Sequence, residues 1–232
     1  MYYHSVMARN KIKRFAENLQ MPHVIQPTFE EIRINGDYYL KNHWQSFFLS
    51  GPGEITLELG CGAGEYSVSL ARLNCNRRFI GIDKKGARLW RGAKISMNEG
   101  LQNIAFLRFQ LHLIDRIFGP RDQISEIWLP FPDPQPGKSR ENKRLTHPRF
   151  LHLYRLFCLP NTIIHLKTDN TELFDYTLDT AHNQNLQIEE IIKDVHNKIP
   201  PNHVLRLITT KYEQMFLNEG KTILYCRFRL FP

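Results

Sequence analysis

Cysteine is scarce in this chain: only Cys61, Cys75, Cys158 and Cys226 occur among its 232 residues. No two of them form a CxxC pair or stand at a spacing typical of zinc ligands, so the sequence predicts neither a bound metal nor a disulfide framework. The ten histidines contain no HExxH motif, which leaves out a common signature of zinc hydrolases.

Long apolar runs are also missing. No segment near the N-terminus has the character of a signal peptide, and no run of about 18 apolar residues is available to span a bilayer. We therefore expect a cytoplasmic protein that has no membrane segment and keeps its thiols reduced.

Acidic residues are outnumbered by basic ones, 23 to 31, which gives a formal net charge of +8. Such an excess favours a polyanionic partner, because each phosphate that a cation neutralises releases condensed counterions. The hydrophobic content of 42% is that of a globular protein, and the length suffices for one large domain.

Strand-like and helix-like segments alternate from residue 55 onward. This spacing is typical of βαβ units and predicts an α/β fold with a mostly parallel sheet. The predicted strands are 55–59, 79–82, 104–109, 124–129, 162–167, 186–195 and 223–230. The predicted helices begin after Gly64 and then cover 84–99, 111–118, 148–158, 171–183 and 210–218.

Residues 1–50 carry few periodic signals. A basic cluster in them fits an arm that lies on nucleic acid or, alternatively, a solvated tail; it consists of Arg9, Lys11, Lys13 and Arg14. The aromatic-rich stretch 38–49 predicts a helix that packs on the main domain. We therefore divide the chain into a basic N-terminal arm with its packing helix, 1–50, and a main domain, 51–232.

A glycine-rich turn follows the first predicted strand in the stretch ELGCGAG, residues 58–64. Glycines let the backbone approach a ligand closely, so Gly60, Gly62 and Gly64 are candidates for a cofactor-binding turn. Asp83 closes the next strand, where an acid can accept both hydroxyls of a ribose. The pattern indicates a nucleoside cofactor, with an ordinary strand–helix turn as the alternative.

NAD fits this turn less well than S-adenosylmethionine does. Glu65 stands where the dinucleotide fingerprint has its third glycine or alanine. Glu58, near the end of the strand, suits the amino group or sulfonium of S-adenosylmethionine, whereas additional carboxylates would repel a pyrophosphate. We expect Cys61 to fill space in the turn, because the sequence indicates no base to activate it.

A second motif, residues 127–145, reads IWLPFPDPQPGKSRENKRL. It begins as an apolar strand, breaks at prolines, presents Asp133 and continues into the basic run Lys138, Arg140, Lys143 and Arg144. Ligands of open α/β sheets bind outside the carboxyl ends of the strands, so an acid followed by cations there indicates chemistry on a polyanion. A proline-rich turn with a solvated charge run is the alternative.

Two acids nearer the C-terminus have purely structural explanations. Asp169 ends the fifth predicted strand and could cap the helix that starts near Thr171. Thr210 and Glu213 have the spacing of a capping box, and from spacing alone the cap is favoured.

Five motifs in one order resemble the bacterial tRNA (guanine-N7-)-methyltransferases over roughly residues 55–230. They are LELGCGAG at 57–64, FIGID at 79–83, PFPDPQPGKSRENKRL at 130–145, HLKTDN at 165–170 and TKYEQMFLNEGKTI at 210–223. The resemblance implies that residues 51–232 form a Rossmann-like S-adenosylmethionine-dependent methyltransferase domain, with a seven-stranded sheet and helices on both faces. It also implies methyl transfer from S-adenosylmethionine to N7 of the guanine in the variable loop of tRNA.

The resemblance assigns roles to individual residues. Glu58, Asp83 and Asp133 map onto cofactor acids, and Asp133 also maps onto the catalytic acid. Gln110 replaces an aspartate that meets the adenine ring, and its carbonyl can still accept from an exocyclic amine. The positions that map onto tRNA contacts are Lys138, Arg140, Lys143, Arg144, Asp169, Thr210 and Glu213.

Two further departures from the family lie in the second motif. Where the family has DPWPK, this chain has DPQPG, so Gln135 replaces the tryptophan and Gly137 a substrate-contacting lysine. Lys138, one residue further on, could take over that contact. Guanine N7 carries an in-plane lone pair and needs no deprotonation, so an acid that orients the base and stabilises the cationic product suffices.

Three alternatives stay open at this point. They are a nucleotide-dependent oxidoreductase, a non-catalytic RNA-binding protein on the same fold, and a methyltransferase for another RNA or for a small molecule. We expect tRNA as the partner, no metal and no membrane, and a monomer or a homodimer.

Overall fold

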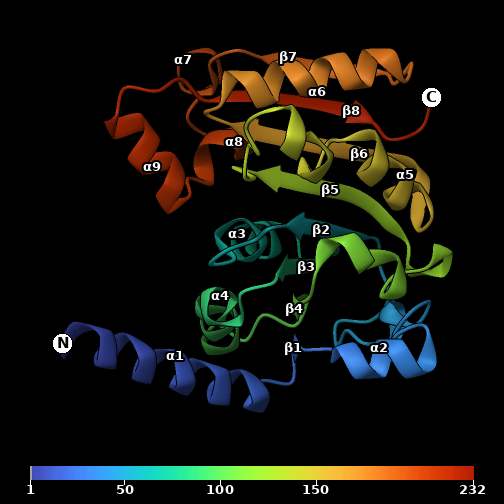
Figure 1. Cartoon of the computed structure of the whole chain (residues 1–232), viewed down its shortest axis with the longest axis vertical. Coiled ribbons are helices and arrows are strands. Elements are labelled where there is room, and N and C mark those ends of the chain that lie inside the picture. The colour runs from blue at the N-terminus through green and yellow to red at the C-terminus, as the bar shows by residue number, and fades with distance from the viewer. Residues whose placement is uncertain (1) are drawn as a thin grey trace.

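The computed structural model describes the backbone of residues 2–232 and the side chains of residues 11–232. An eight-stranded sheet forms its centre, with the strand order β1-β4-β3-β2-β5-β6-β8-β7 (Figure 1). Buried side chains form one cluster on each face of this sheet. The predicted α/β architecture is therefore confirmed.

Five parallel strands make up most of the sheet. They are β2 (Ile55–Leu59), β3 (Arg78–Asp83), β4 (Ile104–Arg108), β5 (Ile124–Pro130) and β6 (Cys158–Thr168). All five residues of β2 are buried, and the polar Thr56 and Glu58 alternate in it with the apolar Ile55, Leu57 and Leu59. β6 begins earlier than predicted, because Cys158 already pairs with Ile124 of β5.

The sheet ends in an antiparallel unit in which β8 (Leu224–Arg229) lies between β6 and β7 (Ile188–Ile192). Thr168 pairs with Leu224 and Ile192 with Tyr225, so the connection from β7 to β8 leaves the sheet at the carboxyl edge of the parallel strands. That connection contains α7 (Val195–Lys198), α8 (Val204–Leu207) and α9 (Lys211–Asn218).

Helices cover both faces of the sheet. One buried cluster joins residues of α3 (Glu65–Leu73), α4 (Gly86–Asn98) and the α7–α8 segment to the strands. The opposite cluster contains residues of α2 (Phe29–Asn35), α5 (Pro148–Arg155) and α6 (Thr171–Asn183). The short 3₁₀ helices η2 (Leu111–Arg116) and η3 (Pro120–Asp122) connect β4 to β5.

The N-terminal region begins with a long helix, α1 (Tyr2–Gln20), which packs beside α4 (Figure 1). The Asn18 side-chain amide donates to the Gly86 carbonyl at 2.9 Å, and the Trp90 indole donates to Glu17 at 2.6 Å. The basic cluster therefore lies on a helix rather than on an irregular tail, and the side chain of Arg9 lies outside the described residues.

Two expectations for the fold are wrong. The sheet has eight strands rather than seven, because β1 (Val24–Ile25) pairs with β4 at the edge of the sheet. Residues 38–49 form turns and only one short 3₁₀ helix, η1 (Trp44–Ser46), instead of a packing helix. The reason is long-range: Asp122 accepts hydrogen bonds from the Asn42 and Trp44 backbone N–H groups, at 2.9 and 3.0 Å.

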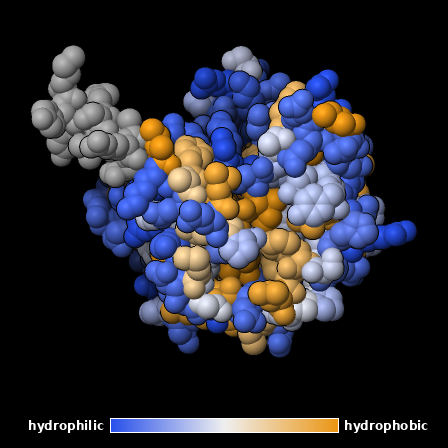
Figure 2. Space-filling view, turned by 90° about the horizontal axis from the view of Figure 1, so that it is seen from below, coloured by the Kyte–Doolittle hydropathy of each residue, from blue (hydrophilic) through white to orange (hydrophobic). Residues whose placement is uncertain are grey.

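The surface beneath the sheet combines apolar and charged residues. Figure 2 looks onto the side where α1 and α2 lie, and a band of apolar residues crosses it between hydrophilic borders. These two helices contribute the exposed side chains Ile12, Leu19, Phe29 and Ile34. Among the described residues, no helix combines the length and the apolar character that crossing a bilayer requires.

Candidate active site

Glu58 lies in the central strand β2 and is only 4% exposed. Its carboxylate accepts the Ser67 backbone N–H at 2.7 Å and also the Ser67 hydroxyl. Burial raises the pKa of Glu58 to about 8; the charges of Glu65 and Asp83 add to this rise, and the hydrogen bonds from Ser67 oppose it. No cation of the described residues contributes to this pKa, so Glu58 has no cationic partner for the charge that it would carry when ionised.

The glycine turn that follows β2 has a backbone conformation that residues with a side chain rarely adopt. Gly60, Gly62 and Gly64 all have positive φ, and a Cβ on Gly64 would lie 2.5 Å from the Phe106 ring. Nothing lies within 4 Å of the place where Gly60 or Gly62 would carry a Cβ, so this side of the turn is open. A ligand can therefore approach the backbone there, as the sequence predicts.

Asp83 fixes the glycine turn to β3. Its Oδ2 accepts the Gly62 N–H at 3.0 Å, and its Oδ1 accepts the Lys85 N–H at 2.7 Å. Each oxygen keeps a lone pair, so the carboxylate can still receive ribose hydroxyls. Cys61 is buried in the same turn, and burial together with Glu58 and Asp83 raises the pKa of its thiol, which fits the predicted space-filling role.

A cavity of about 650 Å³ opens beside the ends of β3 and β4. Gln110 is exposed on its wall, next to the cations Lys84, Lys85 and Arg108. The start of α2 forms an apolar part of the lining with Phe29 and Ile32. The predicted contact of Gln110 with an adenine ring stays a prediction, but the side chain does face a space of sufficient size.

Asp133 is exposed just beyond the end of β5, the strand that pairs with β2. Its Oδ1 accepts the Gln135 N–H at 3.1 Å, which closes a tight turn. Phe131 and Gln135 have φ values of 50° and 47°, a conformation that costs a non-glycine residue free energy and that the surroundings must hold in place. The Phe131 N–H donates to the Lys167 carbonyl at 2.7 Å, and this contact supplies part of that support.

The basic run divides into two groups. Lys138, Arg140 and Lys143 are exposed on the 3₁₀ helix η4 (Lys138–Lys143). Arg144 is only 4% exposed: its guanidinium pairs with Glu172, lies 4.4 Å from the Tyr176 ring centroid and donates to the Pro134 carbonyl at 3.1 Å. The structure thus gives Arg144 the role of holding the turn that follows Asp133, and leaves the other three cations open to a partner.

The C-terminal candidates are less accessible than the sequence suggests. Asp169 is partly buried and pairs with Lys221 at 3.0 Å, and the cap of α6 is Asn170 rather than Asp169. Thr210 caps α9 by accepting the Glu213 N–H at 3.1 Å, but Glu213 does not complete the predicted capping box. Its carboxylate turns inward instead.

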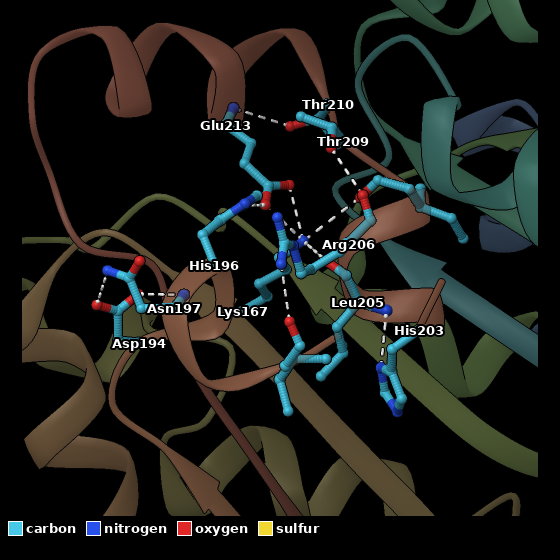
Figure 3. Close-up of polar contacts among 12 residues, drawn as sticks. Lys167, Asp194, His196, Asn197, His203, Leu205, Arg206, Thr209, Thr210 and Glu213 are labelled. Carbon is cyan, nitrogen blue, oxygen red and sulfur yellow. Dashed lines mark hydrogen bonds and ion pairs between the residues drawn. The ribbon is translucent and has the colours of Figure 1, made fainter. Parts of the chain in front are cut away.

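Glu213 and Lys167 form an ion pair that is completely buried. The Lys167 ammonium lies 2.7 Å from Glu213 Oε1 and donates to the Leu205 carbonyl at 2.5 Å (Figure 3). His196 reaches the same carboxylate at 2.8 Å. Burial lowers the pKa of the Lys167 ammonium, and the nearby Glu213 carboxylate partly offsets this effect. Because Lys167 lies on β6 and binds both the Leu205 carbonyl of α8 and Glu213 of α9, its contacts connect these two helices to the sheet.

Sequence reasoning missed Lys167 as a partner of Glu213. A signal was present, because a lysine inside the apolar strand IIHLKT is rarely buried without a partner. The partner itself could not be identified, since 46 residues separate the two. Ser67, the hydrogen-bond donor of Glu58, was missed as well.

Comparisons with known proteins show which proteins this chain resembles. Residues 52–226 match the family described as "Putative methyltransferase". A tRNA (guanine-N(7)-)-methyltransferase of Christiangramia forsetii (strain DSM 17595 / CGMCC 1.15422 / KT0803) is 44% identical over 96% of this chain and 99% of its own length.

Solved structures share the fold at low sequence identity. The 16S rRNA methyltransferase KamB has a TM-score of 0.61 at 14% identity, over 82% of this chain and 91% of its own. A mutant of the 16S rRNA (adenine(1408)-N(1))-methyltransferase from Catenulisporales acidiphilia, solved with its cosubstrate SAM, has a TM-score of 0.51 at 13% identity, over 76% of this chain and 84% of its own.

The central parallel sheet, the open glycine turn and the acids at the strand ends define a Rossmann-like methyltransferase. Within that class, the chain belongs to the tRNA (guanine-N(7)-)-methyltransferase family.

Proposed function

We propose that this protein transfers the methyl group of S-adenosylmethionine to N7 of the guanine in the variable loop of tRNA. The observation that carries the proposal is the position of Asp133, exposed at the end of β5 beside the strand that holds Glu58. The family membership supports the choice of tRNA as substrate and of guanine N7 as the methylated atom.

The residues of the glycine turn fit S-adenosylmethionine. Glu58 is buried without a compensating cation, and the cofactor carries a sulfonium and an ammonium group. Asp83 has free lone pairs for ribose hydroxyls, and the open side of Gly60 and Gly62 lets the cofactor reach the backbone. Glu58, Glu65 and Asp83 together would repel the pyrophosphate of NAD, which disfavours an oxidoreductase.

The cofactor supplies a methyl group on a cationic sulfur, which guanine N7 attacks with its lone pair as the carbon–sulfur bond breaks. The protein therefore has to place the base and stabilise the charge that develops on the purine. Asp133 can do both, because its carboxylate can accept a hydrogen bond from the base and faces the cationic product. Its turn is held by Gln135 and, through Pro134, by Arg144.

The exposed cations Lys138, Arg140 and Lys143 lie only a few residues beyond Asp133 and would bind tRNA phosphates. Asp169, Thr210 and Glu213 remain predicted tRNA contacts. Because Glu213 is completely buried against Lys167, a direct contact of its carboxylate with a base requires this pair to open. A cytoplasmic location, where tRNA is found, also stays a prediction.

The decisive experiment measures methyl transfer from labelled S-adenosylmethionine to unmodified tRNA, followed by nucleoside analysis. We expect 7-methylguanosine, and we expect it to disappear when adenine replaces the variable-loop guanine. Binding of tRNA without methyl transfer would instead favour the non-catalytic RNA-binding protein, since Gln135 and Gly137 replace residues that the family uses. Methylation of another base would assign a different RNA methyltransferase.

A further inference from the structure

The first turn of α3 contacts the segment that carries Thr210. Glu65 follows Gly64 directly, and its Oε2 accepts the backbone N–H of Lys211 at 3.0 Å. Lys211 is the first residue of α9, so its N–H has no acceptor within the helix. One carboxylate therefore joins the glycine turn to the start of α9.

A second contact runs from the next residue of α3. The Tyr66 hydroxyl lies 3.1 Å from the Lys167 ammonium, which also donates to the Ile208 carbonyl. The same ammonium binds Glu213 and the Leu205 carbonyl (Figure 3). Tyr66 and Lys167 are fully buried, so this contact forms a fixed base beneath the segment. Glu65 contributes the exposed contact, and it directly follows the glycine turn that a ligand can approach.

We propose that Glu65 is a positioning residue that couples the binding of the methyl donor to the binding of tRNA. The inference rests on the proposed function, because it takes the glycine turn as the donor site and the Thr210 segment as part of the tRNA site. A donor that orders the glycine turn also orders Glu65, and Glu65 then holds the N-terminus of α9 in place. By reciprocity, tRNA that orders α9 tightens the donor site by the same factor.

The test compares the affinity for S-adenosylhomocysteine with and without saturating tRNA, since this product of the methyl donor has no methyl group to transfer and is not consumed. In the unmodified protein we expect tRNA to tighten binding by about 10-fold. Glu65→Ala should bring this factor to within twofold of unity, whereas Glu65→Gln, whose carbonyl can still accept the N–H, should keep it. The matched control is Glu99→Ala, which removes an exposed carboxylate from Arg72 in the last turn of α3.

A second pair of variants tests the other partner of the hydrogen bond, the Lys211 N–H that donates to Glu65. Proline is tolerated at the first position of a helix, and Thr210 already has the extended conformation that proline requires of the preceding residue. Lys211→Pro therefore removes the N–H with little strain and should abolish the coupling, while Lys211→Ala retains the N–H and should preserve it.

The outcomes separate the two proposals. If the unmodified protein binds no tRNA, the proposed function fails. If it binds tRNA but shows no coupling, or if Glu65→Ala and Lys211→Pro retain the full coupling factor, the function stands and the role of Glu65 is overturned.

Discussion

Glu58 holds a proton at neutral pH in the free protein, because burial raises its pKa to about 8. The pKa in the folded state lies above the ordinary glutamate value of 4.5, so between these two values the folded protein binds more protons than the unfolded chain. The contribution of Glu58 to stability is therefore present at low pH and is lost as the pH rises toward 8.

This protonation makes cofactor binding depend on pH. A cationic cofactor binds the ionised form of Glu58, so we expect its affinity to rise by up to about tenfold per pH unit below pH 8 and then to level off. Calorimetry at pH 7 in two buffers of different ionisation enthalpy should show release of a proton. Glu58→Gln should remove both effects, and an affinity that is constant from pH 6 to 8 would exclude this role.

Asp133 is expected to act on the reaction rather than on binding. Asp133→Asn keeps the oxygen that accepts the Gln135 N–H but removes the charge, so we expect tRNA affinity within about twofold of normal. Turnover should fall by about 100-fold or more, a loss typical of a single electrostatic group in a transition state. Single-turnover methylation measures the effect, and full activity of this variant would contradict the mechanism.

At the scale of single elements, η4 carries the exposed cations that we propose to bind tRNA phosphates, and Arg144 supports the turn. Replacing Lys138, Arg140 and Lys143 together by alanine should lower the slope of log K against log salt by about 2–3, because each phosphate contact contributes about 0.7–0.9. Filter binding at several salt concentrations measures this slope. Arg121→Ala is the control, because Arg121 is exposed on η3 before the start of β5, at the opposite edge of the sheet from η4. An equal slope in the triple variant would rule out η4 as the phosphate-binding element.

The buried ion pair between Lys167 and Glu213 joins β6 to α9. Lys167→Met leaves the Glu213 charge buried without its partner, which should lower the free energy of unfolding by about 3–5 kcal/mol. Adding Glu213→Gln removes that charge and should restore a large part of the loss. Urea unfolding of both variants measures the difference, and a double variant no more stable than Lys167→Met would show that the pair is not the cause.

For the molecule as a whole, the sequence allowed prediction of elements that local patterns determine. The stretch ITLEL before a glycine turn gave β2 its bounds, and the start of α6 at Thr171 was predicted, although its cap is Asn170 rather than Asp169. The turns at 38–49 could not be predicted, because the carboxylate of Asp122 satisfies their backbone from a distant part of the chain. The inward orientation of the Glu213 side chain also depends on a distant residue, because Lys167 binds the carboxylate that would otherwise complete the capping box.

The candidate site likewise combines residues that local sequence patterns identify with residues whose role depends on distant contacts. Glu58, Asp83 and the three glycines belong to one strand–helix–strand unit, β2–α3–β3, and lie close together as predicted. Arg144 belongs to a run of cations that looks uniform in the sequence, and only the packing against Tyr176 and Glu172 separates it from its neighbours. The division of the chain at residue 50 stays a prediction, and β1 ties the N-terminal part into the same sheet.

The two-residue strand β1 has a consequence for solubility. Val24 and Ile25 pair with Phe106 and Leu107, and the His23 carbonyl accepts the Phe106 N–H at 2.8 Å. Without them, β4 would become an open edge with unpaired backbone groups, which is a template for pairing with another chain. A protein shortened to begin at residue 28 should therefore self-associate in light scattering, whereas one shortened only through residue 10 should scatter like the full chain.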